Sequence, residues 1–246
     1  MRLQVVGEPP SGVDTLVAGL PDMGNVAGIA VAHLVSELDM EVFAQLHAYW
    51  PPYVIHREGK ASYSRSLFKF HKPRENRSFV VFSGEFQPHE PATLYELCED
   101  VISYAAQLGV KRVITLGAAH RGDVLPERRV YYAATREELR ESVESSGALA
   151  LEGEGYITGF NGLLLGIAEE HGIGGICILG EIDNPEIRQP KTAKSVLRVL
   201  TRLLGIPDLD YTRLDAEHER IRAQLSLAEE YRRVRRMFGR EPPGVI

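Results

Sequence analysis

The sequence predicts an α/β fold with one open sheet, mixed and mostly parallel, that is flanked by helices and followed by a long C-terminal amphipathic helix. Apolar runs such as Phe79–Phe82 recur along the chain, and segments whose apolar residues have helical spacing alternate with them. From Thr212 this alternation gives way to abundant Glu and Arg around a single apolar stripe. We therefore expect an α/β domain over residues 1–207, and a helical extension with a short tail over residues 208–246.

Glycines, prolines and capping residues mark the ends of the expected elements. Strands are expected at residues 15–20, 41–48, 53–58, 61–70, 79–84, 112–119, 130–133 and 176–180, the second to fourth forming an antiparallel excursion. Helices are expected after Asn25, which can cap the first one, then from Pro91 to Gly109, after Thr135, over 163–168 and from Pro190 to Leu204. This alternation is typical of a mostly parallel or mixed sheet with helices on its faces.

Composition narrows the location and the partners of the protein. No stretch reaches the roughly 20 apolar residues of a membrane span, and the first residues lack the pattern of a signal peptide, so we expect a cytoplasmic protein with no membrane partner. Cys98 and Cys177 lie within apolar patterns and are interpreted as core residues. A formal charge of −6 argues against general nucleic-acid binding. The arginines between residues 232 and 236 suit the last turns of a helix.

One glycine-rich loop joins the first expected strand to the first expected helix. Gly19 and Gly24 have the separation found in a phosphate-binding loop, but Asn25 stands where that motif requires a lysine and Val26 where it requires a hydroxyl. The loop does not match the dinucleotide-binding pattern either. We interpret it as a tight turn that lets helix and strand pack closely, with anion binding at the helix N-terminus as the alternative.

Three further polar loops come after expected strands, at residues 84–89, 117–123 and 180–184. Loops at the carboxyl ends of parallel strands form the usual ligand crevice of such sheets. They suggest an enzymatic hypothesis, in which the Gly24-Asn25 turn and Arg121 bind an anion. His120 or Glu181 would then transfer a proton, as in a nucleoside phosphorylase or hydrolase. The structural alternative is that these loops are polar because they are exposed.

The eight histidines lack metal-ligand spacing and no nucleophile elbow occurs, so neither metal nor cofactor is expected.

Several motifs, taken in order, give the chain a family resemblance. They are Gly19-Leu20-Pro21-Asp22-Met23-Gly24-Asn25-Val26-Ala27-Gly28, Gln87-Pro88, Thr158-Gly159-Phe160-Asn161-Gly162-Leu163-Leu164 and Gly180-Glu181. Over about residues 14–205 the sequence resembles the proteasome assembly chaperone family, particularly its archaeal and bacterial homologues. The resemblance implies a fold similar to purine nucleoside phosphorylases, homo-oligomeric rings, no established catalytic set and proteasome α-type subunits as partners. The positions taken as ligand or family-motif residues are Gly19, Asp22, Gly24, Asn25, Gly28, Gln87, Pro88, Gly159, Asn161, Gly162 and Asn184.

The C-terminal tail departs from the family pattern. Members that dock into the proteasome usually end in a hydrophobic residue, a tyrosine and one further residue, whereas this chain ends in Gly244-Val245-Ile246. The sequence nevertheless favours a non-catalytic, homo-oligomeric assembly chaperone or adaptor that binds proteasome α-type subunits or another protein client. The alternative is the nucleoside phosphorylase-like or hydrolase-like enzyme that binds a small anionic ligand at the carboxyl ends of the strands.

Overall fold

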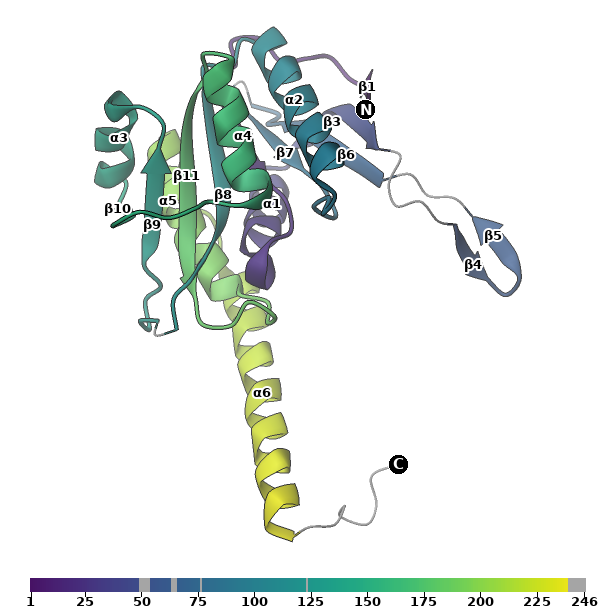
Figure 1. Cartoon of the computed structure of the whole chain (residues 1–246), viewed down its shortest axis with the longest axis vertical. Coiled ribbons are helices and arrows are strands. Elements are labelled where there is room, and N and C mark those ends of the chain that lie inside the picture. Colours follow the sequence, from purple (N-terminus) through teal and green to yellow (C-terminus); the bar gives the residue numbers. More distant parts are fainter. Residues whose placement is uncertain (49–53, 63–65, 76, 123, 239–246) are drawn as a thin grey trace. The chain divides into compact units, whose positions relative to one another are not determined.

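A computed structural model of the whole chain divides into two compact units (Figure 1), Met1–Leu209 and Asp210–Ile246. It describes residues 1–48, 54–62, 66–75, 77–122 and 124–238. The first unit carries the sheet, and the second unit is built on one helix.

The first unit is organised around a nine-stranded sheet with the order β1-β3-β6-β7-β2-β8-β11-β9-β10. Its strands are β1 Arg2–Val5, β2 Thr15–Gly19, β3 Glu41–Ala48, β6 Ser66–Lys72, β7 Phe79–Ser83, β8 Arg112–His120, β9 Val130–Ala134, β10 Leu149–Ala150 and β11 Gly174–Ile182. The centre, β7-β2-β8-β11, is parallel. Antiparallel pairs β6–β7, β3–β6 and β9–β11 flank it. The prediction of an α/β fold with a mixed sheet is therefore confirmed.

Helices cover both faces of this sheet (Figure 1). Helices α1 Val26–Glu37 and α5 Pro190–Leu204 pack together on one face, and α2 Pro91–Gln107 and α4 Gly159–Glu170 pack together on the other. Short helices η1 Met23–Asn25, η2 Glu137–Leu139 and α3 Arg140–Ser145 complete the unit. Strands β2 and β11 are buried along their whole length, because helices lie on both sides of the parallel centre.

Aromatic side chains fill the core between the sheet and the α2–α4 layer. Phe82 lies 4.9 Å from Phe70 and 5.7 Å from Phe160 between ring centroids, so β6, β7 and α4 share one cluster. Phe160 is the second residue of α4 and is fully buried. Its burial anchors the beginning of α4 against the sheet, which places the residues around it at the carboxyl edge of the strands.

The structure corrects several of the expected elements. β1 was not expected; it is short and largely exposed, and it forms by antiparallel pairing with β3. The expected antiparallel excursion divides, because β3 and β6 join the main sheet while β4 Ile55–Arg57 and β5 Lys60–Ser62 form a separate hairpin. Residues 53 and 63–65 of the expected strands lie outside the described residues. β11 extends to Ile182, so Glu181 belongs to a strand and not to a loop.

The second unit contains the helix α6, Thr212–Phe238, in the position that the change of pattern predicted. Asp210 accepts a hydrogen bond from the backbone N–H of Thr212 (2.9 Å), which satisfies one of the free amides at the beginning of the helix. Leu225, Leu227 and Tyr231 are exposed apolar side chains on this helix. Within the described residues, no helix is both long enough and apolar enough to cross a membrane.

Candidate functional site

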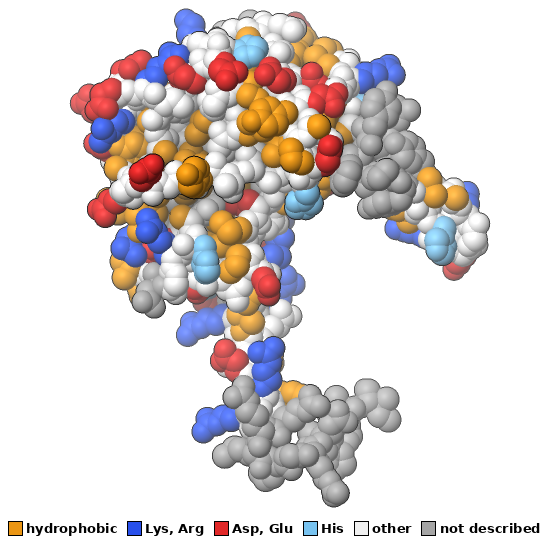
Figure 2. Space-filling model, viewed as in Figure 1, with side chains coloured by type: hydrophobic (Ala, Val, Ile, Leu, Met, Phe, Trp, Pro, Cys, Tyr) orange, Lys and Arg blue, Asp and Glu red, His pale blue; other side chains and the backbone are white. Residues whose placement is uncertain are grey.

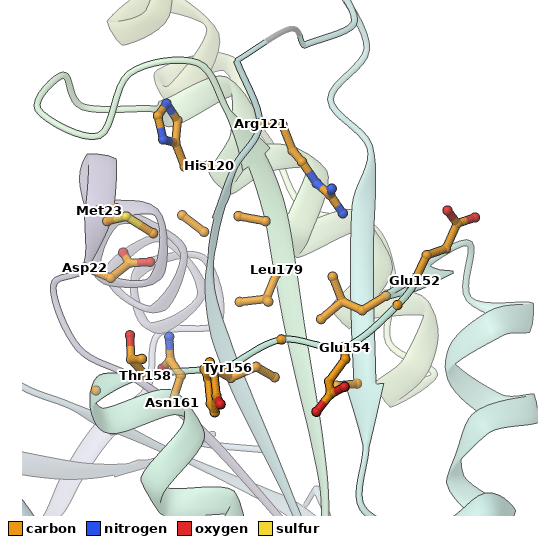
Figure 3. A pocket seen from close by; sticks show the side chains of 18 of the residues that line it. Asp22, Met23, His120, Arg121, Glu152, Glu154, Tyr156, Thr158, Asn161 and Leu179 are labelled. Carbon is orange, nitrogen blue, oxygen red and sulfur yellow. The ribbon is translucent and has the colours of Figure 1, made fainter.

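A pocket of about 640 Å³ opens at the carboxyl end of β8 in the first unit (Figure 3). Most of its wall comes from three segments: the β2–α1 loop with Asp22 and Met23, the end of β8 from Ala118 with the following Arg121, and the β10–α4 loop from Leu151 to Thr158. Gln87, Ala133, Gly159 and Asn161 also line it. Leu179 of β11 contributes an apolar floor. This volume is within the range of small-molecule sites, and the carboxyl edge of central parallel strands is where such sites usually lie.

A sharp turn places Asp22 in this pocket. Gly24 and Asn25 both have left-handed backbone conformations, with φ of 62° and 53°. The turn is held by backbone bonds to the loop after β11, in which Gly24 N–H donates to the Pro185 carbonyl (2.7 Å) and Gln189 N–H donates to the Gly24 carbonyl (2.9 Å). Asn25 does not cap α1 with its side chain, contrary to the expectation. The cap comes instead from Asp22, whose Oδ1 accepts the backbone N–H of Ala27 at 2.9 Å.

The two carboxyl oxygens of Asp22 have different environments in the pocket. Within the described residues its second oxygen, Oδ2, is buried and has no hydrogen-bond partner. Burial raises the pKa of Asp22 to about 7, although nearby backbone amides, that of Ala27 first, act in the opposite direction. A carboxyl group that titrates near neutral pH inside a pocket is a candidate for binding or proton transfer.

The beginning of α4 forms the opposite wall. Gln87 holds it, because Gln87 Oε1 accepts the backbone N–H of Phe160 at 3.2 Å. Asn161 is only 8% exposed, and its Oδ1 has no hydrogen-bond partner within the described residues. Gly117 on β8 makes room for this side chain, since a Cβ there would lie 2.4 Å from Asn161 Nδ2. In Figure 3 the side chains of Asp22, Thr158 and Asn161 converge on one end of the pocket.

The three residues of the enzymatic hypothesis are not all brought together. His120 and Arg121 line the pocket. His120 Nε2 lies 3.2 Å from the carbonyl of Asp183, and the Arg121 guanidinium stacks 4.8 Å from the centroid of the Tyr131 ring. Glu181 does not line the pocket; it is fully buried and holds the loop before β9.

Glu181 is fully engaged in that loop. It accepts hydrogen bonds from the backbone N–H groups of Leu125 (3.0 Å) and Arg129 (2.9 Å), and it pairs with Arg129 Nε at 2.8 Å. Burial alone would raise the pKa of Glu181, but these donors together lower it below its usual value. Such a carboxylate stays ionised at neutral pH and is unsuited to proton transfer.

The other positions taken from the sequence separate into groups. Asp22, Gln87, Gly159 and Asn161 line the large pocket. Gly19 and Gly28 line a smaller pocket of about 260 Å³ beside α1 and β6. Gly24, Asn25 and Asn184 belong to the bonded turns, where Asn184 Oδ1 accepts the backbone N–H of Glu186. Pro88 comes after Gln87 and before α2, and Gly162 packs inside α4, where a Cβ would collide with the Ile157 carbonyl. Gly244, Val245 and Ile246 lie outside the described residues.

Sequence reasoning missed most of the β10–α4 loop. Glu152, Glu154 and Tyr156 line the pocket, and Tyr156 is 95% exposed. The alternation Glu152-Gly153-Glu154-Gly155 was the available signal, because two glycines between carboxylates are typical of an exposed loop. Among the described residues, no group of three or more His, Cys, Asp or Glu side chains is arranged to hold a metal ion.

Comparison with known sequences gives a family match over most of the chain. The model of the PAC2 family matches residues 16–228. A protein of Methanocaldococcus jannaschii, described as uncharacterized, is 34% identical over 193 residues, which is 78% of this chain and 74% of that protein. The family match confirms the resemblance that the motifs predicted.

Solved structures match nearly the whole chain. Pyrococcus furiosus PbaB, described as an archaeal proteasome activator, has a TM-score of 0.81 and 28% identity, and the match covers 93% of this chain and 98% of PbaB. Pyrococcus furiosus PbaA, described as an archaeal homologue of proteasome-assembly chaperone, has a TM-score of 0.76 and 25% identity over 96% of both chains. A Mycobacterium tuberculosis proteasome-assembly chaperone homologue shares the fold at 20% identity and a TM-score of 0.67, over 86% of this chain and 94% of that one.

Proposed function

Because the chain belongs to the PAC2 family, we propose that it is a non-catalytic, homo-oligomeric assembly chaperone or adaptor of the cytoplasmic proteasome, with α-type subunits as clients. The observation that carries this proposal is the similarity to PbaB over 93% of this chain and 98% of that one, because a match of such extent is larger than the α/β unit alone. The separation of Glu181 from His120 and Arg121 favours a binding role over the enzymatic alternative.

Exposed apolar side chains suited to protein binding lie on both units. On the face of the first unit seen in Figure 2, apolar and acidic side chains lie side by side over the α2–α4 layer. Tyr95 of α2 is one exposed aromatic side chain of that unit. In the second unit, Ile221, Leu225 and Ala228 succeed one another at helical spacing on α6. We assign the α6 stripe, defined as Ile221, Leu225 and Ala228, to self-association, because apolar stripes on helices usually pack against another helix.

The client is tested by affinity capture from an extract of the source cells and mass spectrometry of the retained proteins. Wild-type protein is compared with a variant that lacks the last eight residues, 239–246. We expect proteasome α-type subunits to be retained by the wild type, and their loss on truncation would show that the tail docks even without a tyrosine. Retention by both proteins would show that the docking surface lies outside the tail. Failure of both to retain any proteasome component would refute the proposed client.

Self-association is tested with a matched pair of substitutions on α6. Leu225 lies on the stripe, whereas Leu227 is two residues further along and therefore about 200° away around the helix. Both are exposed, Leu225 by 40% and Leu227 by 66%. We expect Leu225→Glu to reduce the mass measured by native mass spectrometry toward that of one chain, and Leu227→Glu to leave it unchanged. Equal behaviour of the two variants would show that the stripe does not hold the oligomer.

A further inference from the structure

We propose that the pocket at the carboxyl end of β8 binds a small organic cation, an amine, amidine or guanidine, whose N–H groups pair with Asp22 and Asn161. Two oxygen atoms at one end of the pocket, Asp22 Oδ2 and Asn161 Oδ1, are buried without hydrogen-bond partners in the part of the chain that the structure describes. Unpaired buried acceptors cost free energy, and a ligand that donates to them removes that cost.

The charges around these atoms favour a cation over the anion of the enzymatic hypothesis. Asp22 is the carboxylate at this end of the pocket; Glu152 and Glu154 also line the pocket, but both are exposed and lie on the other side of it in Figure 3. Arg121 is the opposing cation, but its guanidinium stacks on the Tyr131 ring at 4.8 Å. In Figure 3, Arg121 lies at the other end of the pocket from the place where Asp22, Thr158 and Asn161 converge. An ammonium or amidinium group at the Asp22 end therefore meets acceptors and a carboxylate, whereas an anion there would face an uncompensated charge.

The shape of the pocket limits the rest of the ligand. Leu179, Leu151 and Ile157 provide apolar wall between its polar ends, and the volume of about 640 Å³ suits a molecule of metabolite size. Met23 lies beside Asp22 in Figure 3 and offers an adaptable thioether surface to a flat or alkyl group. The expected ligand therefore has a compact apolar body and one cationic head group that donates several N–H hydrogen bonds.

The raised pKa of Asp22 agrees with this assignment, although the geometry carries it. A carboxyl group whose pKa is about 7 is partly neutral in the empty pocket and becomes fully ionised when a cation binds beside it. Binding of a cation therefore increases the negative charge on Asp22. Glu181, at the same edge of the sheet, has its opposite charge built in.

The test uses three probes of one shape and different charge: benzamidine, benzamide and benzoate. Binding to the full-length protein is measured by calorimetry at about pH 8, where Asp22 is ionised, and is located by the backbone amide signals of Gly153 and Gly155 in NMR spectra. The variant is Asp22→Asn, which keeps an oxygen for the Ala27 amide. The matched control is Asp39→Asn, which makes the same change at an exposed ion pair with Arg74.

We expect benzamidine to bind at least about tenfold more tightly than benzamide, and benzoate to bind least of the three. We also expect Asp22→Asn to weaken benzamidine binding by about tenfold or more, while Asp39→Asn leaves it unchanged. Any of three results with the wild-type protein would overturn the proposal: no saturable binding of benzamidine, equal or tighter binding of benzoate, or benzamidine binding that moves signals outside the pocket. Unaltered benzamidine binding by a folded Asp22→Asn variant would do so as well.

Discussion

Two carboxylates at the carboxyl edge of the sheet, Glu181 on β11 and Asp22 after β2, have opposite environments. Glu181 is fully buried, accepts two backbone hydrogen bonds and pairs with Arg129, and its pKa is lowered. Within the described residues, Oδ2 of Asp22 has no hydrogen-bond partner, and burial raises the pKa of Asp22 to about 7. Burial therefore does not decide what a carboxylate does in this fold; Glu181 has a cationic partner in Arg129, whereas Asp22 has no such partner among the described residues. One group stabilises the protein, and the other costs stability and is available for a ligand.

The largest effect is expected from Glu181→Gln, which replaces the carboxylate by an amide of the same shape. The amide loses the charge opposite Arg129 and turns an N–H group toward one of three donors, so we expect the free energy of unfolding to fall by about 3 kcal/mol. Arg129 is 41% exposed and can turn toward solvent, which keeps the loss at the lower end for a broken ion pair. Urea denaturation of both proteins at neutral pH measures this decrease in the free energy of unfolding.

The same variant has an expected pH dependence. Because the pKa of Glu181 is lowered in the folded protein, its stabilisation is complete above the ordinary value of 4.5 and is lost as the pH falls through the folded pKa. The difference between wild type and Glu181→Gln should therefore shrink in acid. A difference that stayed constant across this range would show that shape, and not charge, holds the loop.

An effect of the opposite sign is expected from Asp22→Asn. The pKa of Asp22 rises from 3.8 to about 7 on folding, so the wild type loses stability as the pH rises between these values, and the variant does not. We expect the variant to be more stable above neutral pH by about 2 kcal/mol, after allowance for the partial exposure of the group, and to match the wild type in acid. The other charged residues that line the pocket are His120, Arg121, Glu152 and Glu154.

The measurement for Asp22→Asn is the melting temperature of both proteins across that pH range. The difference between the two proteins isolates Asp22, because the other charged groups titrate in both. At roughly 2–4 °C for each kcal/mol, the expected gain is a few degrees at high pH. A variant that is less stable than the wild type at high pH would mean that the carboxylate is paired, and the comparison with Glu181 would then fail.

The smallest effect is expected from Asp183→Asn, two residues beyond Glu181. Asp183 pairs with Arg128 at 3.2 Å, but its side chain is 44% exposed, and an asparagine keeps the acceptor that Gln189 Nε2 uses at 2.9 Å. We expect a loss below about 1 kcal/mol in the same urea experiment. A loss as large as that of Glu181→Gln would attribute the effect to the end of β11 as a whole rather than to the buried carboxylate.

The central part of the fold was predictable because its signals are local. Strands such as β2 and β7 are apolar runs bounded by glycine or polar residues, and α5 begins at Pro190 as expected. β1 was not predictable, because its four largely exposed residues become a strand only by pairing with β3. The extension of β11 through Glu181 has the same cause, since Glu181 and Ile182 belong to the strand by pairing with Ala119 and His120 of β8.

The candidate pocket was predictable only in part. The rule that ligands lie beyond the carboxyl ends of parallel strands places His120 and Arg121 correctly at one edge of the sheet. The role of Asp22 depends on the left-handed turn at Gly24 and Asn25, and an asparagine at that point reads as a helix cap in the sequence. The position of the Asn161 side chain depends on Gly117, which is distant in sequence. Contacts between distant segments carry no local pattern.

The backbone hydrogen bonds of Gly24 to Pro185 and Gln189 also determine when this end of the pocket forms during synthesis of the protein. The turn that carries Asp22 leaves the ribosome early, whereas the segment that fastens it is synthesised near the end of the first unit. Contacts between such distant segments form late, since a long loop must close before they are made. The Asp22 end of the pocket is therefore complete only after translation has passed Gln189, so a truncated nascent chain has this end of the pocket unformed.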